Sequence, residues 1–327
     1  MFTRTISVDS GKYETKAAMM ASPGNIKHLS FKTQMSESVE KYSNDTSKSY
    51  SIEFEGNQYL LGEQARIQSF DRSKQSILHK ISTYTAVSNM MKESGSNGDN
   101  INLAIGCPLS IYINKNARKY YKDYIAPSGR KINIKVNDED HNFTILKSVV
   151  YPESSGVIYL NKERYENDLV GVIDIGGLNA NCCIYDNLVP KAGSDAMFTL
   201  EMGGNILTSN IMTKLESEFE TEIGTILYEK VMRDGFIKKS PDASAKRIAE
   251  LKKAHVVDIL TECKRHKWST DNMDIVFTGG TAKLLKNEIK EVFPTAILDH
   301  LDDEASFKNA DGFLKQMLIM CGQAVYL

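Results

Sequence analysis

The sequence predicts an α/β protein, because short apolar runs with the β-branched content of strands alternate with longer segments of helical spacing. The chain has 327 residues, 41% of them hydrophobic, which is enough for more than one core. It also carries a loose internal repeat of strand, Asp-x-Gly turn and strand, spaced about half a chain apart. Together these observations predict two related lobes built on largely parallel sheets.

Four apolar runs end in glycine or in an acid with glycine close behind, as strands do where they hand over to a tight turn. They are Thr5–Val8 before Asp9, Ile101–Ile105 before Gly106, Leu169–Ile173 before Asp174, and Ile275–Phe277 before Thr278. Apolar residues at helical spacing predict helices between them. These are Ile206–Phe219, Ile248–Cys263, Ala282–Phe293 and Phe313–Val325.

The repeat supplies the candidate chemistry. Val8-Asp9-Ser10-Gly11 precedes a predicted strand at Tyr13–Met19, and Ile173-Asp174-Ile175-Gly176-Gly177 precedes one at Ala180–Tyr185. Backbone N–H groups in such turns can cradle phosphate oxygens, and the carboxylates can hold Mg²⁺, usually through water. Two such turns facing one another across a cleft would form a phosphate clamp with a metal between its walls. A third glycine turn, Thr278–Thr281, follows a strand and precedes a helix, where N–H groups are free to meet a nucleotide.

Composition excludes several classes of protein. The formal net charge of −2 does not fit binding of DNA over a broad basic face. The five cysteines form no Cys-x-x-Cys pair, so we expect reduced thiols in a cytoplasmic protein. Neither a signal peptide nor an apolar run of about 20 residues is present, so we expect no membrane segment.

Three segments together resemble the nucleotide-binding motifs of the actin-like ATPase superfamily, in the right order and across essentially the whole chain. Val8–Lys16 resembles its first phosphate loop, Val172–Gly177 its second, and Val276–Gly280 its adenosine motif. Three further segments are similar to those of the filament-forming ParM proteins that segregate plasmids. They are Ile105–Ser110, Tyr151–Ser154 and Phe307–Lys315.

The resemblance implies an actin-like (ribonuclease H-like) fold, with two lobes and an interdomain nucleotide cleft. Domain I would comprise residues 1–155 and 310–327, with a small inserted subdomain around residues 31–75. Domain II would comprise residues 156–309.

The resemblance also assigns roles to residues. Asp9 and Asp174 would hold the Mg²⁺ shell, and Glu153 would orient or deprotonate the attacking water. The nucleotide contacts would come from Ser10, Gly11, Lys12, Lys16, Gly176, Gly177, Leu178, Asn179, Gly203, Gly204, Gly279 and Gly280. After Gly177 many relatives carry a threonine whose hydroxyl meets phosphate, whereas this chain has Leu178-Asn179-Ala180, so a side-chain contact would be lost.

The implied function is a polymerising ATPase that uses ATP (or GTP) and Mg²⁺ and self-associates into filaments. A small DNA-binding adaptor of the ParR kind, bound at a plasmid centromere, would be its partner, and no direct nucleic-acid binding or membrane binding is expected. Two other classes stay open. A sugar or acid kinase of the same superfamily would need a further general-base aspartate, and no convincing motif for one is present. A chaperone ATPase would need a peptide-binding domain, for which the sequence leaves no room after the last predicted helix.

Overall fold

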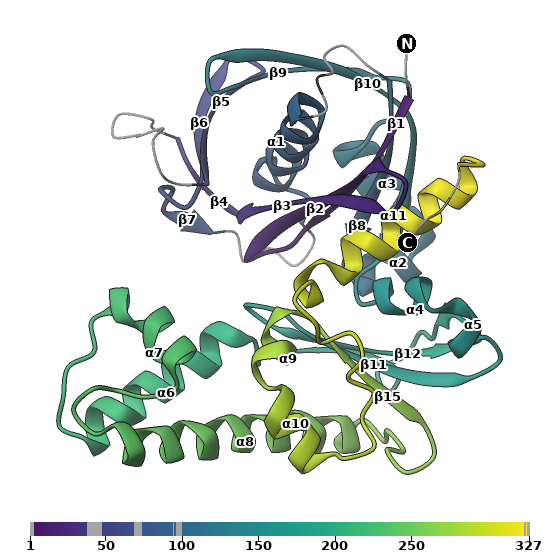
Figure 1. The fold of residues 1–327 in the computed structure, drawn as a ribbon. Helices are drawn as coiled ribbons and strands as arrows, with labels where there is room; N and C mark the ends of the chain where they lie inside the picture. The colour runs from purple at the N-terminus through teal and green to yellow at the C-terminus, as the bar shows by residue number, and fades with distance from the viewer. Residues whose placement is uncertain are drawn as a thin grey trace. The chain divides into compact units, whose positions relative to one another are not determined.

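The computed structural model describes residues 3–37, 48–68, 74–93, 95, 100–323 and 325. The chain forms two compact units, the first being Met1–Arg164 with Phe307–Leu327 and the second Tyr165–Ser306. Figure 1 shows the elements of each unit. The short α5 (Lys162–Tyr165) and the 3-10 turn η2 (Ala305–Phe307) lie where the chain passes between units.

Unit 1 is built on a ten-stranded sheet with the order β3-β2-β1-β8-β10-β9-β5-β6-β4-β7. Its strands are β1 (Thr3–Ser10), β2 (Glu14–Ser22), β3 (Asn25–Lys32), β4 (Gln34–Ser36), β5 (Ser49–Phe54), β6 (Asn57–Gly62), β7 (Ile67–Gln68), β8 (Asn100–Cys107), β9 (Lys131–Val136) and β10 (Glu139–Pro152). Its helices are α1 (Ile77–Glu93), α2 (Leu109–Ile113), α3 (Lys115–Ile125), α4 (Gly156–Leu160) and α11 (Lys308–Met320).

The sheet of unit 1 curls around α1, as Figure 1 shows. Alternate residues of β2 serve two cores, as the period of a strand requires. Ala17 and Met19 join the cluster that contains α1, whereas Ala18 packs with Ala310 and Leu314 of α11. The two helices therefore cover opposite faces of β2, and α11 reaches the end of the sheet where β1 stops.

Unit 2 contains a second sheet with the order β13-β12-β11-β15, to which β14 adds by pairing with β12. Helices α6, α8, α9 and α10 pack around it through a single apolar cluster that includes Ile173, Leu207 and Ile259. The elements are β11 (Leu169–Ile175), β12 (Ala180–Asp186), β13 (Val189–Pro190), β14 (Met197–Leu200), β15 (Asp274–Thr278), α6 (Gly204–Glu218), η1 (Thr225–Leu227), α7 (Tyr228–Asp234), α8 (Pro241–Arg265), α9 (Gly280–Leu284) and α10 (Lys286–Val292).

The predicted α/β class and its four anchor strands are confirmed, but the prediction of largely parallel sheets is wrong. Among the described strands, only β1–β8–β10 and β11–β15 run parallel. The remaining pairs are antiparallel, beginning with the hairpins β1–β2 and β11–β12. A hairpin needs only a short turn between its strands, whereas a parallel pair needs a long crossover. Apolar runs followed by helices indicate such crossovers, whereas short, half-polar strands carry no such signal.

All four predicted helices have different bounds in the structure. Ile206–Phe219 corresponds to α6 (Gly204–Glu218), and Ile248–Cys263 to the longer α8 (Pro241–Arg265). The segment Ala282–Phe293 forms two helices, because Leu285 leaves helical geometry and is completely buried between α9 and α10. The last helix begins earlier than the predicted Phe313 and ends at Met320, where the N–H of Cys321 donates to Met317 O at 3.0 Å.

The inserted segment expected around residues 31–75 is described only in part, since residues 38–47 and 69–73 lie outside the described ranges. Its described portions contribute β4 to β7 to the edge of the large sheet. Over the described residues, no helix combines the length and the apolar character needed to cross a bilayer.

Candidate functional site

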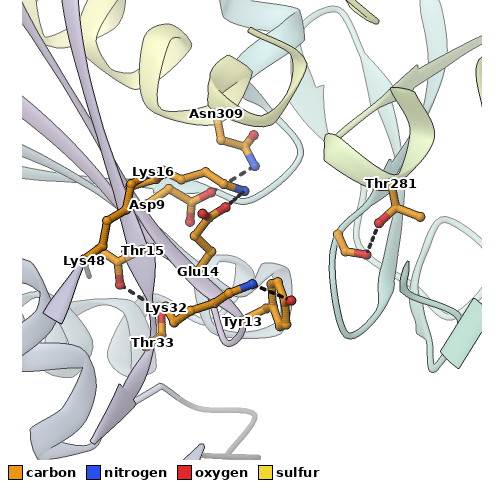
Figure 2. Close-up of polar contacts among 12 residues, drawn as sticks. Asp9, Tyr13, Glu14, Thr15, Lys16, Lys32, Thr33, Lys48, Thr281 and Asn309 are labelled. Carbon is orange, nitrogen blue, oxygen red and sulfur yellow. Dashed lines mark hydrogen bonds and ion pairs between the residues drawn. The ribbon is translucent and has the colours of Figure 1, made fainter. Parts of the chain in front are cut away.

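The first turn of the repeat joins β1 and β2. Asp9 is the penultimate residue of β1 and lies opposite Lys16 in the antiparallel register. Directly opposed residues share a face of the sheet, and Figure 2 shows the Lys16 side chain extending beside Asp9. The N–H of Gly11 donates to Asp9 O at 3.0 Å and closes the turn after Ser10. The Lys16 amine lies 3.7 Å from the Glu14 carboxylate, and the Lys16 side chain is 19% exposed, so it can reach a solvent-borne anion.

Asn309 connects this turn to two helices (Figure 2). Its amide nitrogen donates to Asp9 Oδ2 at 3.3 Å, and its amide oxygen accepts from the N–H of Gly156 at 3.2 Å. The starts of α11 and α4 are thereby tied to the Asp9 carboxylate. Sequence reasoning gave Asn309 no role in the site, although it lies within the Phe307–Lys315 segment that carried part of the resemblance.

The second carboxylate oxygen of Asp9 fits a cation. Asp9 is 9% exposed, and its Oδ1 is buried without a hydrogen-bond partner within the described part of the chain. Such an orphaned buried oxygen is costly and calls for an explanation. Gly106 leaves room beside it, since a Cβ at that position would lie 3.1 Å from Asp9 Oδ1. A hard cation that prefers carboxylate and water oxygens, such as Mg²⁺, suits this oxygen.

Glu153 follows β10 and is 8% exposed. Its N–H donates to Cys107 O at 2.9 Å, which fixes its backbone beside the end of β8. Its carboxylate forms an ion pair with Lys74, a residue that sequence reasoning missed. Burial raises the pKa of the neighbouring Cys107 thiol well above its usual value, so this cysteine is not a nucleophile near neutral pH.

In unit 2 the second turn follows β11 and is built almost entirely from backbone groups. The N–H of Gly176 donates to Asn179 O at 2.9 Å, which closes the turn around Gly177 and Leu178. The carbonyl of Gly176 accepts from the N–H of Gly204 at 3.0 Å and from the Thr281 hydroxyl at 2.9 Å (Figure 2).

The glycine turn at Gly203–Gly204 packs directly against this one. The N–H of Asn205 donates to Gly177 O at 2.8 Å. A Cβ on Gly203 would lie 2.3 Å from the carbonyl carbon of Leu178, so the start of α6 touches the turn at residues 176–179 at a spacing that only glycine permits. The N–H groups of residues 204 and 205 therefore brace the turn.

The third turn lies beside Asp174. Gly279 has a φ of 98°, and a Cβ there would lie 2.5 Å from Ile175 O and 2.6 Å from Asp174 Oδ1. The glycine thus lets the strand β15 end next to the Asp174 carboxylate and start α9 at Gly280.

The structure gathers the predicted residues within each unit. Unit 1 holds Asp9, Ser10, Gly11, Lys12, Lys16 and Glu153. Unit 2 holds Asp174, Gly176, Gly177, Leu178, Asn179, Gly203, Gly204, Gly279 and Gly280. The structure adds Lys74, Asn309 and Thr281. Of these, Thr281 could have been found from its place directly after the third glycine turn.

Comparisons with known proteins bear on the fold of the chain. Residues 7–156 match the family model of the actin-like proteins' N-terminal domain. A filament structure of Alp12 has 27% sequence identity and a TM-score of 0.73, covering 98% of this chain and 100% of that one. A 15-stranded ParM filament from Clostridium botulinum has 19% identity and a TM-score of 0.73, covering 97% and 99%. The archaeal actin homologue Ta0583 in complex with ADP has 16% identity and a TM-score of 0.71, covering 94% and 97%. A search of curated protein sequences finds no match.

Proposed function

We propose that this chain, which has an actin-like fold and matches the family model of the actin-like N-terminal domain, is an ATPase whose polymerisation into filaments is coupled to hydrolysis. One observation carries the proposal. Asp9 is the penultimate residue of β1, before a glycine turn, and its buried Oδ1 has no hydrogen-bond partner among the described residues, as expected for a carboxylate that binds a nucleotide-bound cation. The ADP complex of Ta0583 and the filaments of Alp12 and ParM support nucleotide binding and self-association.

Each residue contributes by position and charge, which is most of what phosphoryl transfer requires. The turns at Gly11 and at Gly176–Gly177 offer backbone to phosphate oxygens, with Lys12 and Lys16 adding positive charge. Asp9 and Asp174 would hold Mg²⁺, which neutralises phosphate charge when bound. The turns at Gly203–Gly204 and Gly279–Gly280 would serve the nucleoside side. Leu178 and Asn179 offer backbone groups where relatives carry a threonine.

Glu153 is the proposed water-orienting residue. In the hydrolysis step a water oxygen forms a bond to the γ-phosphorus while the bond from that phosphorus to the β–γ bridging oxygen breaks. ADP leaves, and the proton of the water passes to the Glu153 carboxylate or to solvent.

By resemblance to ParM, we propose plasmid segregation as the biological role, with a small DNA-binding adaptor of the ParR kind linking the filament to a centromere. The net charge of −2 favours such an adaptor over direct contact with DNA.

Pelleting and light scattering of purified protein test the proposal. At tens of micromolar, addition of ATP and Mg²⁺ should raise pelleted protein above the nucleotide-free control, and the signal should decay as ATP is consumed. An Asp174→Ala variant, and wild type with a chelator, should lose both the scattering and the phosphate release. Pelleting that never exceeds the control would replace this proposal with the small-molecule kinase.

A further inference from the structure

A buried ion pair joins two distant parts of unit 1. Lys74 precedes α1 and Glu153 follows β10, and the ammonium of the first contacts Oε1 of the second. The side chains are 3% and 11% exposed. Fully buried lysines are rare, because an ammonium removed from water loses its hydration. A negatively charged partner must offset that loss of hydration free energy. The pair is therefore unlike the exposed ion pairs elsewhere in the unit.

The backbone on both sides of the pair is strained. Lys74 has a φ of 52° and the residue after Glu153, Ser154, has a φ of 68°. Residues other than glycine adopt this left-handed conformation at an energetic cost, and they keep it where the surroundings enforce it, often at functional sites. Here Ser154 is completely buried. Both ends of the ion pair are thus held by the fold.

The charge of Asp9, the proposed metal ligand, also acts on Lys74. Burial alone would lower the pKa of Lys74, but the charges of Glu153 and then Asp9 raise it, and its pKa lies above the ordinary value. Lys74 is therefore an ammonium throughout the physiological range. It is the positive charge shared by two buried carboxylates that sequence reasoning had assigned to different tasks.

We propose that Lys74 is a positioning residue for Glu153, holding its carboxylate in one orientation for the attacking water. The inference rests on the proposed function, because it requires Glu153 to orient that water. A carboxylate with a free rotamer would spend much of its time pointing elsewhere, and small misplacements of a catalytic group are costly.

A double-mutant cycle tests the proposal, using Lys74→Met, Glu153→Gln and the double variant. Lys74→Met keeps the length of the side chain and removes its charge. We expect it to slow phosphate release at saturating ATP by about 10- to 100-fold, with nucleotide affinity within about twofold of wild type. In the Glu153→Gln background, Lys74→Met should cause no further slowing, because Lys74 acts only through Glu153.

A second measurement needs no turnover. In nucleotide-free protein, the thermal midpoints of the two single variants should fall, and the double variant should be at least as stable as Lys74→Met, since it leaves no charge buried alone. Lys92→Met is the matched control. Lys92 belongs to the same unit but pairs with Glu139 at the surface, with side chains 56% and 52% exposed, and this change should alter neither turnover nor the midpoint.

Several results would overturn the proposal. Phosphate release by Lys74→Met within twofold of wild type would leave Lys74 with a purely structural role, as would losses that multiply in the double variant. If Lys74→Met does not fold, Lys74→Arg replaces it, because its charge is retained while its planar guanidinium displaces the carboxylate. An Arg variant with wild-type turnover would reject positioning. Normal phosphate release by Glu153→Gln would show that Glu153 does not orient the water. Of these results, only that one would also contradict the proposed function.

Discussion

The candidate site residues of the two units differ in kind. Unit 1 uses side chains, namely the buried carboxylates of Asp9 and Glu153, the buried Lys74 ammonium and the half-buried Asn309 amide. Unit 2 uses main-chain groups, with three glycine turns bonded to one another and Thr281 as a brace. Loss of a buried charge should therefore be the damaging change in unit 1, and an added Cβ the damaging change at the turns of unit 2, where the proposed metal ligand Asp174 is an exception.

The difference between buried charged groups and backbone turns suits the two units to different tasks. Buried charges can polarise or orient a reacting group, but each needs a partner, so they tolerate little change in charge. Backbone turns present N–H groups and carbonyls without side-chain entropy, but they depend on close approach that only glycine permits. Substitution of a buried charge in unit 1 and of a turn glycine in unit 2 can test this difference.

The largest expected effect is on turnover in unit 1. Glu153→Gln should slow phosphate release by roughly 10²–10⁴-fold, the contribution of a positioned base. Gln is preferred to Ala because it fills the same space beside the buried Lys74. Nucleotide binding and initial filament growth should be nearly normal, and disassembly should be delayed, because filaments would remain longer in the triphosphate state. Phosphate release and pelleting would be measured side by side.

Glu139→Gln is the control for that variant. Glu139 is the first residue of β10, the strand that directly precedes Glu153, but it is exposed and pairs with Lys92. Unchanged phosphate release by Glu153→Gln would mark Glu153 as a structural acid. Loss of nucleotide binding would assign it to support of the site.

The next effect is on stability in unit 2. Gly279→Ala places a methyl group 2.5 Å from Ile175 O at a backbone conformation reserved for glycine. The conformational cost and the overpacking each contribute about 1–3 kcal/mol, so we expect roughly 2–6 kcal/mol of destabilisation in urea unfolding. Gly224→Ala is the matched control, because nothing lies within 4 Å of its added Cβ. Equal stability of the two variants would show that the close contact between position 279 and Ile175 O does not limit substitution.

The contrast also explains what the sequence could predict. The glycine turns of unit 2 are local signals, and Asp9 and Lys16 belong to one hairpin, so these residues could be selected from short motifs. Lys74 and Asn309 could not, because their approach to Glu153 and Asp9 depends on how α1 and α11 pack against the sheet. No spacing rule links positions 9, 74, 153 and 309.

The fold was predictable to a similar depth. Apolar strands that end at glycine were found because burial on both faces gives a continuous apolar run, as in β8 and β11. The half-exposed β3 and the short β4 carry no such run, and their antiparallel pairing was missed. The break at Leu285 was also invisible, since its apolar side chain fits the helical pattern on either side of it.

The smallest expected effect is a pH dependence in unit 2. His255 of α8 is 7% exposed, and its Nε2–H donates to Met202 O at 3.1 Å, directly before the Gly203 turn. Burial lowers the pKa of His255, opposed by the hydrogen bond to Met202 and the charge of Asp258. The folded protein therefore keeps this imidazole neutral at a pH where the unfolded chain, with a pKa of about 6.5, already binds a proton. Stability must fall as the pH drops through that value, because the unfolded state then binds more protons.

His255→Gln isolates this contribution, because the glutamine amide can donate to the same carbonyl but does not titrate. In urea unfolding between pH 7 and pH 5, the wild-type protein should lose more stability than the variant as the pH falls. The difference should be at most about 1.4 kcal/mol per pH unit, the limit for one titrating group. At pH 7.5 and above the two proteins should differ little, since both hold a neutral donor at Met202. Parallel pH profiles would show that His255 titrates alike in both states, whereas a large loss at pH 7.5 would mean that the imidazole supports the Gly203 turn by packing. Either result would weaken the description of unit 2 as a region whose turns are held by uncharged hydrogen bonds.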